Sequence, residues 1–138
     1  MYRLLLIALL FLNPAFAQKS AKCSKVYIQT ETPAIYKNGE KDITKFYHDA
    51  ILPVLTAYLN ADGGGVISSL RPILTINTLG TVTEVKFTNL TITAEFENKL
   101  KAEFMKMQGW KPGKNKKKVV CSAVVLPVYY VSWKRSNG

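Results

Sequence analysis

Few side chains in this sequence are suited to catalysis or metal binding. His48 is the only histidine among 138 residues, and Cys23 and Cys121 are the only cysteines. A conventional zinc site needs a cluster of His, Cys or carboxylate ligands, and a Ser-His-Asp triad needs a histidine beside an activated nucleophile. No nucleophile motif or phosphate-loop motif accompanies His48. We therefore expect no bound metal, no cofactor and no enzymatic activity.

The positive charges are the second chemical feature. The chain has 19 Lys and Arg against 9 Asp and Glu, which gives a formal net charge of +10. Five of the lysines gather in one short stretch directly after Trp110: Lys111, Lys114, Lys116, Lys117 and Lys118. Lysines displace counterions from a polyanion, and an exposed tryptophan can stack on a base. One hypothesis is therefore a polyanion-binding module for nucleic acid or lipopolysaccharide, and the alternative is a solvated loop.

The N-terminal stretch has the composition of a secretory signal peptide. One basic residue precedes an apolar run from Leu4 to Leu12, and the small residues Ala15 and Ala17 follow. Signal peptidase accepts small side chains at such positions, and the apolar run is too short to span a bilayer. We assign residues 1–17 to a signal peptide cleaved after Ala17. We expect a periplasmic or secreted protein with no integral membrane segment after cleavage, which makes nucleic acid an improbable partner.

Export also permits disulfide formation, and Cys23 and Cys121 are the only two candidates. An intramolecular bond would tie the leader, residues 18–25, to the last strand of the domain. Free thiols and an intermolecular bond are the alternatives. Attachment of a lipid to Cys23 is disfavoured because Lys22 directly precedes it.

The hydrophobic share of 48% and the length indicate one folded domain, which we place at residues 26–133, followed by a polar tail at 134–138. Asp42 is expected to cap a helix that ends before Pro53, and Pro53 is expected to begin a second short helix. Residues 66–88 alternate between apolar and polar as a β-hairpin does.

The C-terminal third contains the clearest helical pattern and the longest strand pattern. Phe96, Leu100 and Phe104 recur at helical spacing, and a candidate strand then runs over residues 119–133. Pro127 cannot donate to a strand ladder, so this strand should lie at a sheet edge or bulge there. The element order predicts an α+β fold, in which a small antiparallel sheet, made of a hairpin and a C-terminal edge strand, packs against helices.

Three motifs resemble the TonB C-terminal domain family, especially its Bacteroidetes-type members, over residues 26–133. They are Trp110-Lys-Pro112-Gly113, Leu126-Pro127-Val128-Tyr129-Tyr130, and the turn Gly80-Thr-Val82-x-x-Val85. Two local departures are Leu52, where the family has an aromatic residue, and the expanded glycine run before Val66. The chain also has no uncleaved anchor or proline-rich spacer, so we expect no energy coupling by this chain alone.

The resemblance implies a non-catalytic protein-binding domain. Its edge strand would pair with an extended segment of an envelope protein or an outer-membrane receptor, because a free strand edge offers unpaired backbone groups. The residues implied in partner binding flank Pro127 and are Val124, Val125, Leu126, Val128, Tyr129 and Tyr130. Core packing and an edge-to-edge homodimer are the alternative roles for the same residues.

Overall fold

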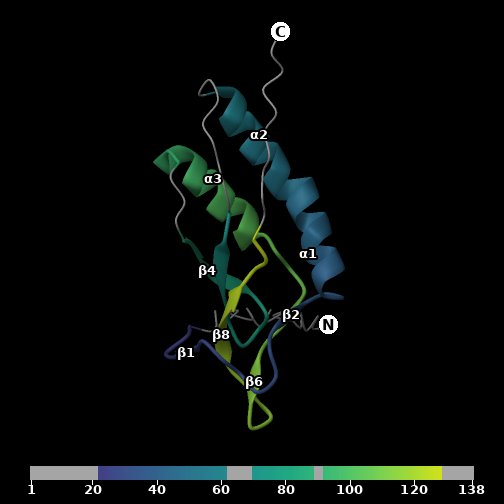
Figure 1. The fold of residues 1–138 in the computed structure, drawn as a ribbon. Coiled ribbons are helices and arrows are strands. Elements are labelled where there is room, and N and C mark those ends of the chain that lie inside the picture. Colours follow the sequence, from purple (N-terminus) through teal and green to yellow (C-terminus); the bar gives the residue numbers. More distant parts are fainter. Residues whose placement is uncertain (1–21, 62–69, 89–91, 129–138) are drawn as a thin grey trace, which may run out of the picture.

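The structure, a computed structural model, describes residues 22–61, 70–88 and 92–128 (Figure 1). It confirms the predicted small α+β fold. Four strands form the main sheet in the order β1-β8-β3-β4. These strands are β1 (Val26–Tyr27), β3 (Pro72–Ile76), β4 (Val82–Phe87) and β8 (Cys121–Val125). Helices pack on the sheet face that carries the buried side chains of Leu74, Ile76, Val82 and Val85.

The N-terminal helical segment is continuous from Glu40 to Ala61 and forms one long column in Figure 1. It comprises α1 (Glu40–Phe46), a π-helical stretch η1 (Tyr47–Ile51) and α2 (Leu52–Ala61). The predicted break before Pro53 is therefore wrong. In the wide π turn the Leu52 N–H donates to the carbonyl of Tyr47, five residues back. The hydrogen bonds just before Pro53 therefore do not follow the four-residue spacing of an α-helix. A proline that would clash with the preceding turn of an α-helix is accommodated in this way.

The predicted N-cap at Asp42 is also wrong, because Gly39 is the N-cap and adopts a positive φ of 98°. The Asp42 carboxylate instead accepts hydrogen bonds from the backbone N–H of Asn38 at 3.0 Å and from its side-chain amide at 3.1 Å. The backbone bond is the main reason that the pKa of Asp42 lies below its ordinary value. Asp42 thus closes the turn that leads into α1.

The predicted hairpin is confirmed as β3 and β4, with a bulge between Thr75 and Ile76. Asn77 organises its turn, because its side-chain oxygen accepts the N–H groups of Leu79 and Thr81. Gly80 has a φ of 77°, and a Cβ there would lie 2.2 Å from the carbonyl oxygen of Trp110. Only glycine fits at this contact, so the hairpin turn packs directly against the backbone at Trp110.

The helix predicted around Phe96, Leu100 and Phe104 is confirmed as α3 (Ala94–Met105), which Thr93 caps. Glu95 pairs with Lys99 at 3.0 Å and Glu97 with Lys101 at 2.9 Å on its exposed face. On the buried face, the ring of Phe104 lies 5.7 to 5.8 Å from the rings of Phe46, Tyr47 and Phe87. This aromatic cluster joins α3 to the first helical column and to β4.

The single long strand predicted at residues 119–133 is not observed. Short pieces replace its N-terminal part and the loop before it, namely β5 (Trp110–Lys111), β6 (Lys114–Asn115) and β7 (Lys118–Val119). β5 pairs with β2 (Ile35–Tyr36), while β6 and β7 form a hairpin. At Val120 the backbone N–H turns away to donate to Gly113, so the main-sheet strand β8 begins only at Cys121. It ends at Val125, two residues before Pro127, and residues 129–133 lie outside the described part.

Candidate functional site

The outer edge of β8 is covered over only part of its length. β1 runs parallel to β8 and pairs Val26 with Cys121 and Tyr27 with Ser122. On its other side β8 pairs with β3 from Ser122 to Val125. The predicted edge strand is therefore second in the sheet, and within the described residues its outer edge is without a strand partner only after Ser122. The sequence does not predict that β1 pairs with the outer edge of β8.

The ladder with β3 shows which backbone groups face this uncovered edge. The Leu126 N–H donates to the Pro72 carbonyl at 3.0 Å, so Leu126 and, two residues earlier, Val124 direct their backbone groups toward β3. Successive strand residues direct these groups to opposite sides. The N–H and C=O of Val125 therefore point away from β3, beyond the end of β1.

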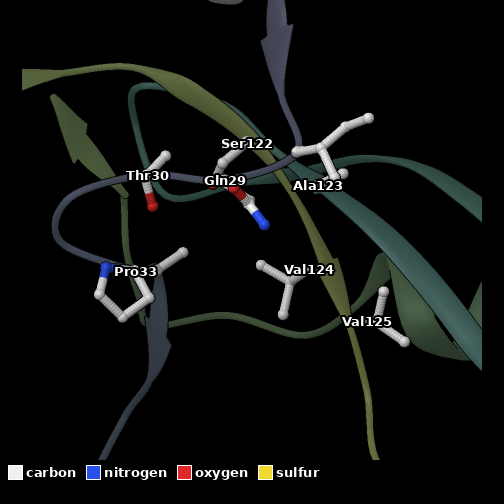
Figure 2. A pocket seen from close by; sticks show the side chains of 9 residues that line it. Gln29, Thr30, Pro33, Ser122, Ala123, Val124 and Val125 are labelled. Carbon is white, nitrogen blue, oxygen red and sulfur yellow. The ribbon is translucent and has the colours of Figure 1, made fainter.

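A groove of about 410 Å³ borders the uncovered edge (Figure 2). After Tyr27, the last residue of β1, the chain diverges from β8. It forms the second wall of the groove before it reaches β2. The residues that line it are Ile28, Gln29, Thr30, Pro33, Ala34 and Ser122 to Val125. In Figure 2, Pro33 and Val124 face each other across the groove, and the Gln29 side chain projects into it. This shape fits an extended segment beside β8.

Two large aliphatic side chains at the rim of the groove are exposed, next to the polar lining residues Gln29 and Thr30. Ile28 exposes 85% of its surface and Val125 exposes 57%. Side chains of a strand that paired with β8 here could contact these two aliphatic groups. The sequence predicts no role for the wall residues 28–34.

The predicted partner-binding residues occupy different environments. Val125 lies at the exposed edge, whereas Val124 is half-buried and packs against the core. Leu126 is only 2% exposed, so its side chain belongs to the core and cannot contact a partner. Val128 is half-buried, and Tyr129 and Tyr130 lie outside the described residues.

A disulfide joins Cys23 to Cys121, which is the intramolecular alternative among those that the sequence left open. Cys121 is the first residue of β8, and Cys23 lies just before β1. The bond therefore fastens β1 to the N-terminal end of β8 and fixes where the covered part of the edge begins.

The lysines of the predicted basic loop are all exposed, but Trp110 is not. Lys111, Lys114, Lys116, Lys117 and Lys118 are solvent-exposed around β5, β6 and β7. Trp110 is 5% exposed and packs against Tyr36 with ring centroids 5.2 Å apart. The prediction that Trp110 stacks on a base is therefore wrong, because its ring fills the core between β5 and β2.

His48 is exposed on the helical column, where it contacts the Asp49 carboxylate at 3.1 Å. Asp49 also pairs with Lys45, and the bond from Lys45, followed by that from His48, lowers the pKa of the Asp49 carboxyl. The described part of the chain contains no cluster of three or more His, Cys, Asp or Glu residues that could hold a metal ion. The prediction of no metal stays a prediction.

Comparisons of the chain with protein-family models, with curated proteins and with solved structures found no match. Among the described residues, no helix has the length and apolar character needed to cross a membrane. The features of the chain that bear on function are the β8 edge, the groove and the exposed lysines.

Proposed function

We propose that this chain is an exported, non-catalytic protein-binding domain. The edge of β8 at Val125 pairs with an extended segment of an envelope or outer-membrane protein, in the manner that the resemblance to the TonB C-terminal domain family implies. The observation that carries the proposal is the uncovered edge after Ser122 beside the groove. Main-chain hydrogen bonds supply affinity in this mode, and the groove receives alternate side chains.

The disulfide supports a location in the periplasm or outside the cell. Structural disulfides persist in oxidising compartments, and the composition of residues 1–17 agrees with export. In such a compartment the protein meets the extracytoplasmic parts of envelope proteins. These parts are the partners we expect.

A proline at Val125 tests the proposal. Val125→Pro removes the outward N–H but leaves the bonds of Val124 and Leu126 to β3 in place. We expect residues 18–138 carrying this change to capture no partner from the envelope of the native host, while the unchanged chain captures an envelope protein at low and at moderate salt.

Val125→Thr is the matched control, because it keeps the N–H and the β-branched shape. Circular dichroism should show that both variants fold. Equal capture by the folded Val125→Pro variant and by the unchanged chain would contradict edge pairing. A dimer of the unchanged chain that Val125→Pro dissociates would instead identify a second copy as the occupant.

Polyanion binding is the second candidate, and the exposure of the five lysines in the 111–118 segment favours it. An electrostatic complex of this kind weakens steeply as salt rises. Recovery of anionic material only at low salt, with no dependence on Val125, would support this function over strand pairing.

A further inference from the structure

The net positive charge of the described residues comes from two stretches, one near each end of the described chain. The described residues 22–38 and 107–128, which we call the lysine-rich region, carry eight lysines and a single carboxylate, Glu31. This region contains β1, the groove and β8. No lysine lines the groove itself, so the positive charge acts on a docked segment from the lysines of the surrounding segments.

The β6–β7 hairpin holds the densest group of lysines in an unfavourable backbone conformation. Its two turn residues, Lys116 and Lys117, have φ values of 48° and 63°. Asn-Gly is the preferred pair in such a turn, and a side chain such as lysine is disfavoured there. Both lysines are exposed, so core packing does not explain their presence. Retained strain at an exposed turn points to a role for the side chains themselves.

Hydrogen bonds to the segment before β2 hold this hairpin in place. Thr32 and Lys114 exchange backbone hydrogen bonds of 3.0 and 2.9 Å. The Glu31 N–H donates to the side-chain oxygen of Asn115, and the Lys116 N–H donates to the Glu31 carboxylate, each at 2.9 Å. The carboxylate of Glu31, the only carboxylate in the lysine-rich region, therefore accepts a hydrogen bond from the hairpin backbone. Among the described residues, no lysine of the hairpin forms an ion pair with a carboxylate.

The hairpin is continuous with the groove. Thr30 and Pro33, which line the groove, flank Thr32, which pairs with Lys114. Gly113, at the base of the hairpin, lies so close to Thr30 and Ser122 that a Cβ there would approach both within about 3.2 Å. In Figure 1 the β6 hairpin projects from the end of the molecule opposite α2 and α3. A segment that leaves the groove past Thr30 therefore reaches the hairpin lysines.

We propose that the β6–β7 hairpin selects acidic partners. This inference rests on the proposed strand pairing: the segment that pairs with Val125 carries Asp or Glu residues at one end, and these contact the lysines of the hairpin. The lysines concerned are Lys114, Lys116, Lys117 and Lys118. A protein segment is favoured over nucleic acid because the groove offers backbone pairing, and because the aromatic ring nearest to these lysines in sequence, that of Trp110, is buried.

The test replaces the strained lysines with the residues that the turn prefers. Lys116→Asn with Lys117→Gly removes two charges and relaxes the turn. We expect the thermal midpoint of unfolding to rise while binding of an acidic probe weakens about fivefold at low salt, because two exposed contacts are lost. The probes are synthetic peptides with a Val-Thr-Val-Thr core and four glutamates at either end, compared with peptides that carry glutamines instead.

The control removes two exposed charges from α1, through Lys41→Gln with Lys45→Gln. This variant should keep the preference of the unchanged chain for the glutamate peptides. Equal binding of glutamate and glutamine peptides by the unchanged chain, or no binding of either, would overturn the inference. So would an undiminished preference in the hairpin variant.

Val125→Pro separates the two proposals. Val125→Pro could abolish binding of both peptides while the hairpin variant keeps the full preference for glutamate. That pair of results would contradict acidic selection and leave strand pairing in place. Glutamate-peptide binding that survives Val125→Pro would contradict strand pairing. A single-stranded DNA oligonucleotide that binds as tightly as the glutamate peptide, whether or not Val125 is changed, would identify a general polyanion site and overturn both.

Discussion

Two regions of this molecule differ in how they use charge. The helical region, residues 40–61, 70–88 and 92–106, carries seven basic and seven acidic residues in its described part. Five of its six described lysines pair with nearby carboxylates, as Lys99 does with Glu95. The lysine-rich region has eight lysines against Glu31 alone, and none of these lysines is ion-paired among the described residues.

The regions also differ in how their backbones are covered. The helical region buries an aromatic cluster around Phe104, which is fully buried. The lysine-rich region consists of two-residue strands, a strained turn and a β8 edge that β1 covers only to Ser122. Stability and recognition are therefore largely separable here, because none of the fully buried core residues lines the groove, and only Ala34 and Val124 both line it and pack against the core.

The largest expected effect concerns the disulfide, which links the two ends of a stretch of 98 residues and so constrains both regions. Cys23→Ala with Cys121→Ala should lower the free energy of unfolding by about 4 kcal/mol, because the unfolded chain regains the entropy of that loop. Urea denaturation measures the change, and reduction of the unchanged protein is the matched control. A loss of less than about 1 kcal/mol would contradict this account.

The next effect tests whether the helical region is independent of binding. Phe104→Ala should destabilise the fold by about 3.5 kcal/mol, because it leaves a cavity among Phe46, Tyr47 and Phe87. The folded fraction should still bind the glutamate peptide with unchanged affinity at low temperature. Weaker binding by the folded variant would show that the two regions are coupled.

Tyr47 of the helical region contacts Pro127 of the lysine-rich region, and its ionisation should change the stability of the fold by a smaller amount. Its hydroxyl donates to the Pro127 carbonyl at 3.2 Å, and burial raises the pKa of this phenol well above its usual value of 10.0. The folded state therefore retains the proton more strongly than the unfolded state does. The resulting stability is fully present below pH 10 and is lost as the pH rises above the unfolded value, by up to about 1.4 kcal/mol per pH unit.

Tyr47→Phe is the control for this pH dependence. It should cost about 1 kcal/mol at neutral pH through the lost hydrogen bond and should flatten the fall in stability between pH 10 and pH 11. Chemical denaturation at both pH values measures the difference. An equally steep fall in the variant would assign the effect to other tyrosines or to lysines.

The elements that local pattern determines could be predicted from the sequence. The helix around Phe96, Leu100 and Phe104 and the hairpin predicted at 66–88 follow from periodicity. Both are observed, the hairpin as Pro72–Ile76 and Val82–Phe87, while residues 66–69 lie outside the described part. The break at Pro53 was predicted wrongly, because a π turn is a response of the backbone that side-chain spacing does not reveal.

The candidate site was predictable only in part, because it depends on long-range pairing. Val125 was identified, but Leu126 and Trp110 were assigned to binding although both are buried. The sequence marks both as apolar without showing which face they occupy. The parallel pairing of β1 with β8, more than 90 residues apart in the chain, leaves no local signal, and it determines where the uncovered edge begins.

Amide hydrogen exchange at Val125 shows whether the outer edge of β8 is free in the unbound protein and paired in the complex. In the free protein, the N–H groups of Val124 and Leu126 should exchange slowly because they face β3, whereas that of Val125 should exchange rapidly. The captured partner, or the glutamate peptide, should slow Val125 and leave its two neighbours unchanged. Slow exchange of Val125 in the free monomer, or no slowing in the complex, would contradict the account of β8 as the docking edge.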